Sequence, residues 1–99
     1  MQALTKQQIQ EQLQAQAYDG WQLKTNQEGI FFLEKVFEFT TYMQGPHFAQ
    51  EVALIAEKLD HHPEILIKYK LVQISIFSHD ANGLTNKDFA FISELAQIS

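Results

Sequence analysis

The apolar residues of this chain follow two strand-like patterns with one long helical pattern between them. Residues 21–23 and 30–39 alternate around a polar turn that ends at Gly29, and this predicts a β-hairpin. Residues 65–70 and 72–77 alternate on either side of a short link, which predicts a second hairpin. Because an isolated hairpin is only marginally stable in water, we expect the two hairpins to share one sheet.

The segment between the hairpins predicts the main helix, over residues 46–62. Pro46 suits the first helical position, where a missing N–H group costs nothing, and Pro63 disfavours helical geometry at the residue before it. The apolar stripe of this helix consists of Phe48, Val52, Ile55 and Leu59.

Shorter helices are predicted at the two ends of the chain. Thr5-Lys6-Gln7-Gln8 and Thr85-Asn86-Lys87-Asp88 both have the pattern of a capping box. Apolar residues follow at helical spacing: Ile9, Leu13 and Ala17 before Gly20 ends the first helix, and Phe89, Ile92 and Leu95 or Ala96 in the second. The order α-β-β-α-β-β-α predicts an α+β fold in which three helices cover one face of a four-stranded antiparallel sheet.

Length and composition narrow the class of protein. The 99 residues predict one domain, 1–99, and an apolar fraction of 45% indicates a globular chain. A net charge of −5 without a lysine or arginine block argues against nucleic acid or an anionic membrane as a partner. The absence of cysteine excludes disulfides and thiolate chemistry. No apolar stretch has the length of a membrane span or the pattern of a signal peptide, so we expect a cytoplasmic protein.

Three of the four histidines stand where predicted elements end. His61 and His62 end the main helix, and His79 follows the fourth strand. By the parity of that strand, His79 lies on the face of Gln73 and Ser75, away from the aliphatic face. Imidazole is the side chain whose ordinary pKa lies nearest neutral pH, so it can give or take a proton there. Such an arrangement is consistent with a small active site.

A longer pattern surrounds these histidines. It consists of Glu57-Lys58-Leu59-Asp60-His61-His62-Pro63-Glu64, Tyr69, Ser78-His79-Asp80, Gly83-Leu84-Thr85 and Asp88. Together these residues closely resemble the pterin-4a-carbinolamine dehydratases, and the match continues without gaps from about Phe37 to the C-terminus. The pair Gly20-Trp21 also resembles the first strand of that family.

The resemblance implies a hydro-lyase that removes water from 4a-hydroxytetrahydropterins and yields the quinonoid dihydropterin, as in tetrahydrobiopterin recycling. A carbinolamine is already activated, because its ring nitrogen can expel the neighbouring hydroxyl. The departing oxygen must be protonated and a proton must be taken from the ring, and imidazoles can do both. We therefore expect a pterin substrate and no cofactor.

The resemblance also implies roles for individual residues. The candidate catalytic residues are His61, His62 and His79, and the candidate substrate-binding residues are these three with Asp60, Ser78 and Asp88. By carry-over from the matching positions, His61 and His79 would be the acid and base that flank C4a, and His62 would orient the pterin ring. Asp60 and Asp88 could orient the histidines or stabilise their charge, and Ser78 could contact the polar edge of the substrate.

Each of these residues also has a purely structural interpretation. His61 and His62 could cap the helix, and Asp88 could serve only the capping box that Thr85 opens. His79 and Asp60 could simply be exposed. Tyr69 alternates with Ile65 and Ile67, so we expect it to pack in the core.

Two other functions remain open. His61, His62, His79, Asp80 and Asp88 contain enough nitrogen and oxygen ligands for zinc or iron. We expect no metal, because neighbouring histidines at a helix end chelate one ion poorly. In the other alternative the chain is a protein-interaction module, a dimerisation cofactor of a transcription factor that uses the apolar stripe of the main helix.

Self-association is the last expectation. An exposed sheet edge gains by pairing, so we expect a homodimer or a homotetramer. Gly45-Pro46 falls where the family usually has uninterrupted main helix, and that helix packs against symmetry mates in tetramers. The sequence therefore leaves the choice between dimer and tetramer open.

Overall fold

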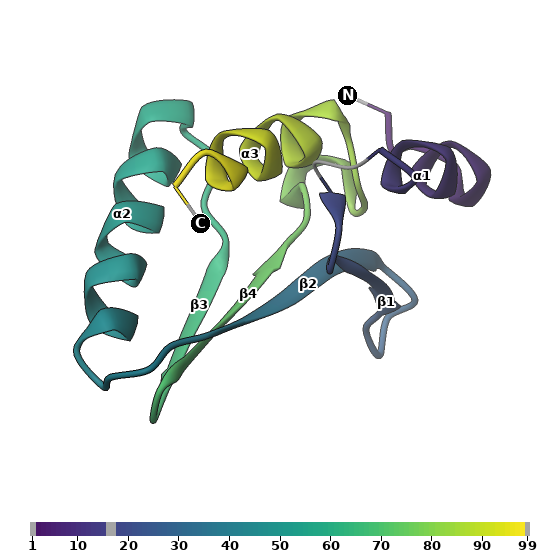
Figure 1. Cartoon of the computed structure of the whole chain (residues 1–99). Coiled ribbons are helices and arrows are strands. Elements are labelled where there is room, and N and C mark those ends of the chain that lie inside the picture. Colours follow the sequence, from purple (N-terminus) through teal and green to yellow (C-terminus); the bar gives the residue numbers. More distant parts are fainter. Residues whose placement is uncertain (1, 16–17, 99) are drawn as a thin grey trace.

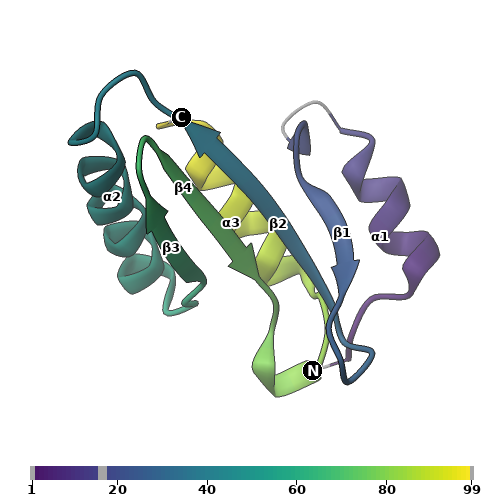
Figure 2. The same cartoon turned by 90° about the horizontal axis from the view of Figure 1, so that it is seen from below.

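The two predicted hairpins lie in one antiparallel sheet and are joined through their inner strands. The computed structural model describes residues 2–15 and 18–98. Its elements are α1 (Lys6–Leu13), β1 (Gln22–Thr25), β2 (Phe31–Glu38), α2 (Gln44–Leu59), β3 (Glu64–Lys68), β4 (Leu71–Ile76), the short 3-10 helix η2 (His79–Ala81) and α3 (Asn86–Ala96). The strand order is β1-β2-β4-β3, and the three α-helices lie on one face of the sheet (Figures 1 and 2). This confirms the predicted α+β fold and its element order.

Strand register places alternate residues on opposite faces of the sheet. Leu33 on β2 pairs with Ile76 on β4, and Phe37 pairs with Val72, so these residues face the helices. Their neighbours Glu34 and Ser75, which also pair, therefore face the opposite side. We call that side, which the helices leave uncovered, the open face of the sheet (Figure 2).

Both predicted capping boxes are present. The Thr5 side chain accepts from the backbone N–H of Gln8, and the side chain of Gln8 accepts from the backbone of Thr5. Thr85 and Asp88 form the equivalent pair at the start of α3. The first helix is shorter than predicted, because α1 ends at Leu13 rather than near Gly20. Ala17 lies outside the described residues.

The main helix is displaced by about half a turn from its predicted range of 46–62. It begins at Gln44, so Pro46 occupies the third position of the first turn, where the backbone N–H has no partner within the helix in any case. It ends at Leu59 because Asp60 adopts the left-handed conformation, with φ 50° and ψ 47°. His61 and His62 consequently lie outside the helix.

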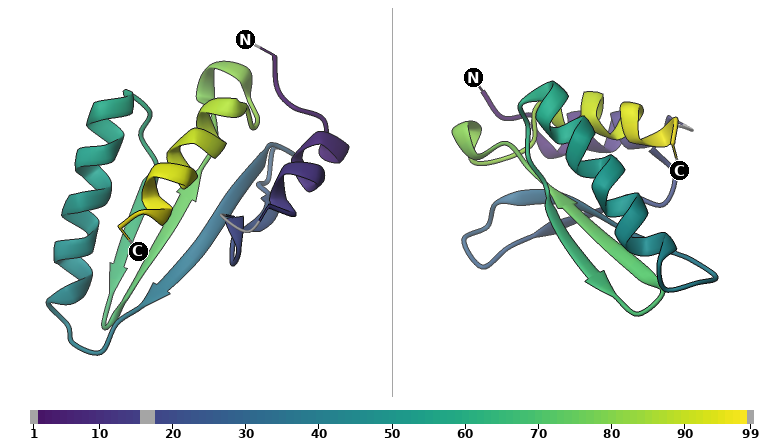
Figure 3. Two further views of the ribbon diagram at one scale, coloured as in Figure 1. Left: turned by 45° about the horizontal axis from the view of Figure 1, so that its top comes forward. Right: turned by 90° about the vertical axis from the view of Figure 1, so that its left-hand side faces the viewer.

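Half of the apolar stripe of α2 lies in the hydrophobic core. Val52 is fully buried, Phe48 is 7% exposed, and both belong to the hydrophobic core with Val72 of β4. Figure 3 shows α2 and α3 on the same side of the sheet. Phe48 and Val52 are therefore not available to a partner, whereas Ile55 and Leu59 are only partly buried against the core.

Tyr69 is also corrected. The third strand ends at Lys68, and Tyr69 lies in the turn before β4, where it is 70% exposed. Its ring stacks on that of Tyr42, with 6.1 Å between ring centroids.

Among the described residues, no helix combines the length and the apolar character that crossing a membrane requires.

Candidate active site

The end of α2 determines where His61 and His62 lie. The backbone N–H of Asp60 donates to the carbonyl groups of Ala56 and Glu57, and that of His61 also donates to Ala56. An aspartate tolerates the left-handed conformation better than most residues, because its short polar side chain can bond locally. The chain therefore turns sharply at Asp60 and enters β3 from the side of the sheet where β4 ends.

A second tight turn places His79 opposite His61 and His62. After β4 the chain forms η2, and Asn82 adopts the left-handed conformation that its residue type allows. Ser78 and Gly83 form an isolated antiparallel bridge that closes the turn. His79, at the first position of η2, is thereby held at the end of β4, on the side of the sheet predicted from strand parity.

The three histidines line one cavity of about 230 Å³. The other residues around this space, which we call the histidine cavity, are Asp60, Ser78, Asp80 and Lys87. Five of the six predicted site residues therefore come together here. Imidazoles from two segments far apart in the sequence meet in one space, which is the arrangement that proton transfer to and from a bound molecule requires.

Asp88, the sixth predicted site residue, lies beneath this cavity rather than in it. Its side chain is fully buried, and one carboxylate oxygen is 2.6 Å from Nε2 of His61. The other oxygen accepts hydrogen bonds from Oγ of Ser78 at 2.8 Å and from the backbone N–H of Thr85 at 2.9 Å. The buried carboxylate contacts His61 rather than the cavity, and its capping role and its histidine contact coexist.

The Asp88 contact determines which nitrogen of His61 is available. An ionised carboxylate only accepts hydrogen bonds, so opposite an ionised Asp88 it is Nε2 of His61 that carries the hydrogen. In the neutral ring this leaves the lone pair on Nδ1, which can accept a proton. The His61 side chain is 12% exposed, so little water competes for that position.

Ser78 belongs to the same hydrogen-bond network as Asp88 and Thr85. Its hydroxyl donates to Asp88 and lies 2.8 Å from the hydroxyl of Thr85, and the residue is 3% exposed. The predicted contact between this hydroxyl and the substrate is therefore not supported, because the hydroxyl points toward the buried carboxylate.

His62 and His79 have more open surroundings. Nε2 of His62 lies 3.0 Å from a carboxylate oxygen of Glu57, and the His62 side chain is 55% exposed. The ring of His79 packs against Phe77, with 4.2 Å between ring centroids. Among the described residues, no side chain is hydrogen-bonded to the His79 ring, so its nitrogens can meet a bound molecule or water.

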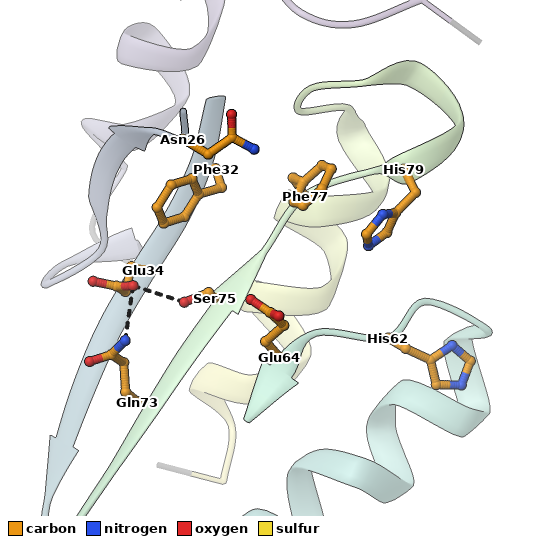
Figure 4. A pocket seen from close by; sticks show the side chains of 9 residues that line it. All are labelled: Asn26, Phe32, Glu34, His62, Glu64, Gln73, Ser75, Phe77 and His79. Carbon is orange, nitrogen blue, oxygen red and sulfur yellow. Dashed lines mark hydrogen bonds between the residues drawn. The ribbon is translucent and has the colours of Figure 1, made fainter. Parts of the chain in front are cut away.

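A second cavity of about 230 Å³ lies next to the first, on the open face of the sheet. His62 and His79 line both cavities, so the two lie side by side at these rings. The remaining lining residues of this open-face cavity are Asn26, Phe32, Glu34, Glu64, Gln73, Ser75 and Phe77 (Figure 4).

Glu34 is held as an anion in the wall of the open-face cavity. One carboxylate oxygen accepts from Nζ of Lys24, and the other accepts from Ser75 at 2.9 Å and Gln73 at 3.1 Å. The hydrogen bond from Lys24 lowers the pKa of Glu34, against the opposing effect of burial, and the bond from Ser75 lowers it further. The residue is therefore ionised at neutral pH.

Sequence reasoning missed most of this second cavity. Glu34 and Ser75 were visible as polar positions inside apolar runs, and strand parity places both on the face of His79. Lys87 in the histidine cavity had no comparable signal, and Asp80 was named only in the family pattern and as a possible metal ligand. Within the described part of the chain, no three histidine, aspartate or glutamate side chains are grouped so that they could hold a metal ion.

Comparisons with known proteins identify the family of this chain. The family model described as pterin 4 alpha carbinolamine dehydratase matches residues 2–98. A protein of Vibrio vulnificus strain YJ016, provisionally named as a pterin-4-alpha-carbinolamine dehydratase, is 42% identical over 97% of this chain and 84% of its own length. A protein of Sulfurisphaera tokodaii with the same provisional name is 32% identical over 99% of this chain and 98% of its own.

Two solved structures resemble this one. A crystal structure described as a transcriptional coactivator/pterin dehydratase from Brucella melitensis has a TM-score of 0.83 and 33% identity, and 97% of each chain is covered. A pterin dehydratase-like RuBisCO assembly factor of the alpha-carboxysome has a TM-score of 0.67 over 83% of this chain and 92% of its own, and at 22% identity it shows the shared fold alone. The chain belongs to the pterin-4a-carbinolamine dehydratase family.

Proposed function

We propose that this protein dehydrates 4a-hydroxytetrahydropterins to quinonoid dihydropterins by histidine acid–base catalysis, in tetrahydrobiopterin recycling. The observation that carries the proposal is the convergence of His61, His62 and His79 on one cavity, with His61 held by a buried carboxylate. Membership of the dehydratase family supplies the class of substrate. The hydrogen bonds of the site give the histidines different roles.

In this mechanism His61 is the base. Its Nδ1 lone pair takes the proton from the ring nitrogen next to C4a, and the nitrogen's electron pair then expels the neighbouring hydroxyl. Asp88 keeps Nε2 protonated and stabilises the imidazolium that forms, since the carboxylate is buried beside it. The substrate loses one proton at this step and the C4a–O bond breaks.

His79 is the acid. Its imidazolium donates a proton to the departing oxygen, so the hydroxyl leaves as water rather than as hydroxide. Its exposed position lets it regain a proton from solvent, and His61 returns one, so the enzyme is unchanged after each cycle. His62 and Asp60 would orient the pterin ring from the cavity wall. The mechanism needs no cofactor, and a cytoplasmic location remains part of the proposal.

The test is the acceleration of 4a-hydroxytetrahydropterin dehydration over its spontaneous rate, followed by ultraviolet absorbance. His61→Ala and His79→Ala should each lower the acceleration by about 10²-fold or more, the range typical of a lost acid or base. His47→Ala, a change of the same type at an exposed position in the first turn of α2, should leave it unchanged. Circular dichroism should be the same for all three. A wild-type protein without acceleration would contradict the proposal.

We also propose that the chain associates with a second copy through β3. This strand is the outer strand of the sheet on its side, and Leu66 and Ile67 on it are 46% and 44% exposed. An edge strand with unpaired backbone groups and apolar side chains favours pairing. A homodimer satisfies this edge, and a homotetramer would need a further interface.

A further inference from the structure

The open-face cavity differs in chemistry from the histidine cavity beside it. Within the described part of the chain, its lining includes the carboxylates of Glu34 and Glu64 and no lysine or arginine. The histidine cavity, by contrast, includes Lys87 among its lining residues. A molecule that extends from the histidine cavity into the open-face cavity therefore passes His62 and His79 and then meets the carboxylates of Glu34 and Glu64.

The floor of the open-face cavity is aromatic. Phe32 on β2 and Phe77 after β4 are both partly buried. Figure 4 shows the Phe32 ring on β2 and the Phe77 ring just past the end of β4, with His79 beyond it. Such rings pack well against the carbon atoms of a short aliphatic chain. The hydrogen-bonding groups around them include three acceptors, namely Glu34, Glu64 and the amide oxygen of Gln73.

The size of the two cavities points to one ligand that occupies both. Each measures about 230 Å³, below the roughly 300–1,000 Å³ of typical small-molecule sites. Because His62 and His79 border both, a heterocycle between the histidines can direct a substituent over Phe77 into the open-face cavity.

We propose that the open-face cavity is the subsite for the side chain of the pterin, and that it selects neutral, hydroxyl-bearing side chains over anionic ones. This inference rests on the proposed function. Hydroxyl groups donate to the acceptors on the wall, whereas a carboxylate or phosphate would face Glu34 and Glu64. Glu34 is the main determinant, because Lys24, Ser75 and Gln73 fix its charge in place.

Glu34 also holds the ammonium group of Lys24. Its bond to Nζ of Lys24 offsets the positive charge of that ammonium group, which lies outside the cavity lining. Replacing Glu34 by Gln removes the anion and leaves the ammonium without its partner. Both effects favour an anionic ligand, so this substitution should reverse the discrimination rather than merely weaken binding.

The test uses three stable fluorescent pterins: 6-hydroxymethylpterin, 6-methylpterin and pterin-6-carboxylate. Fluorescence titration of the wild-type protein should show the hydroxymethyl compound binding tightest and the carboxylate about tenfold or more weaker, the effect of roughly one like-charge contact. In Glu34→Gln the affinity for pterin-6-carboxylate should rise by about tenfold relative to 6-methylpterin. Glu64→Gln should change the ratio in the same direction.

Glu38→Gln is the matched control. Glu38 lies on the same strand and the same face as Glu34, four residues on, and does not line the cavity. Its substitution should leave all three affinities unchanged. If the protein binds the pterins but Glu34→Gln and Glu38→Gln give equal ratios, the subsite is refuted and the dehydratase proposal stands. If none of the three pterins binds, the subsite is refuted, and the dehydration assay decides the dehydratase proposal separately.

Discussion

Asp88 contacts His61 through one carboxylate oxygen, while the other accepts from Ser78 and from the backbone of Thr85. All the hydrogen bonds in this set are made within the core, because Asp88 is fully buried. A change at this single residue therefore affects both the start of α3 and the protonation of His61. Asparagine has the same shape as aspartate but can donate, so it separates these two roles.

We expect Asp88→Asn to fold but to lose activity. The asparagine oxygen can keep the bonds from Ser78 and Thr85, while its NH₂ group donates to Nε2 of His61. The His61 hydrogen then moves to Nδ1, which can no longer accept a proton. The dehydration rate should fall by about 10²–10⁴-fold, and the free energy of unfolding by only about 1–3 kcal/mol.

Nitrogen-15 NMR of the His61 ring provides the direct measurement. The wild-type protein should show the hydrogen on Nε2 and Asp88→Asn should show it on Nδ1. Asp80→Asn is a suitable control, because Asp80 lines the same cavity but is exposed. An Asp88→Asn variant with full activity and an unchanged tautomer would contradict the role assigned to Asp88.

Glu34 makes stability depend on pH. The hydrogen bond from Lys24 lowers its pKa in the folded state below the ordinary value of 4.5, so the unfolded chain binds the proton at a higher pH than the folded one does. The stabilisation by Glu34 is therefore fully present above about pH 4.5 and is lost as the pH falls through the lowered value. Urea unfolding of the wild type and Glu34→Gln should differ most at neutral pH and converge in acid. Parallel pH profiles would contradict this.

At the scale of elements, the C-terminal end of α2 positions two of the three histidines. Asp60, with φ 50°, turns the chain so that His61 reaches Asp88 while His62 reaches Glu57. Only residues that tolerate the left-handed region can make this turn without strain. Glycine adopts it freely, and a β-branched residue does not.

We expect Asp60→Gly to be about as stable as the wild type and Asp60→Val to be less stable. The left-handed conformation costs most residues other than glycine, asparagine and aspartate about 1–2 kcal/mol, which corresponds to a fall in Tm of roughly 4–16 °C for a chain of this size. Thermal unfolding monitored by circular dichroism measures this difference. Equal melting temperatures for the two variants would show that the turn does not depend on the conformation of residue 60.

At the scale of the whole molecule, helices cover one face of the sheet. Strand β3 lies at an edge of the sheet and has exposed apolar side chains. We expect the wild type to have at least twice its chain mass of 11.4 kDa in solution. Replacing Leu66 and Ile67 together by lysine should reduce the mass to that of a monomer, because charged residues block pairing at a sheet edge.

Light scattering coupled to size-exclusion chromatography measures the mass. Leu54→Lys is the matched control, since Leu54 is 64% exposed on the outer side of α2. It should leave the association through β3 intact. A monomeric wild type, or dissociation by Leu54→Lys but not by the β3 variant, would contradict the proposed interface.

Much of the fold was predictable because the signals are local. The capping boxes at Thr5 and Thr85 and the alternation in β2 and β4 depend on residues close together in the chain, and the structure confirms them. Boundaries were less accurate where a single backbone conformation decides them. The left-handed turn at Asp60 ended α2 early, and the turn after Lys68 left Tyr69 in solvent.

The sequence alone determined the kinds of elements, their order, and the set of histidines whose pattern resembles the dehydratases. Those features reflect spacing along the chain, which periodicity and residue type reveal directly. The tertiary structure alone decided that Asp88 lies buried under His61, 27 residues away, and that Glu34 faces the same space as His79. Such contacts depend on how separate segments pack, and no local pattern encodes the direction in which two distant side chains meet.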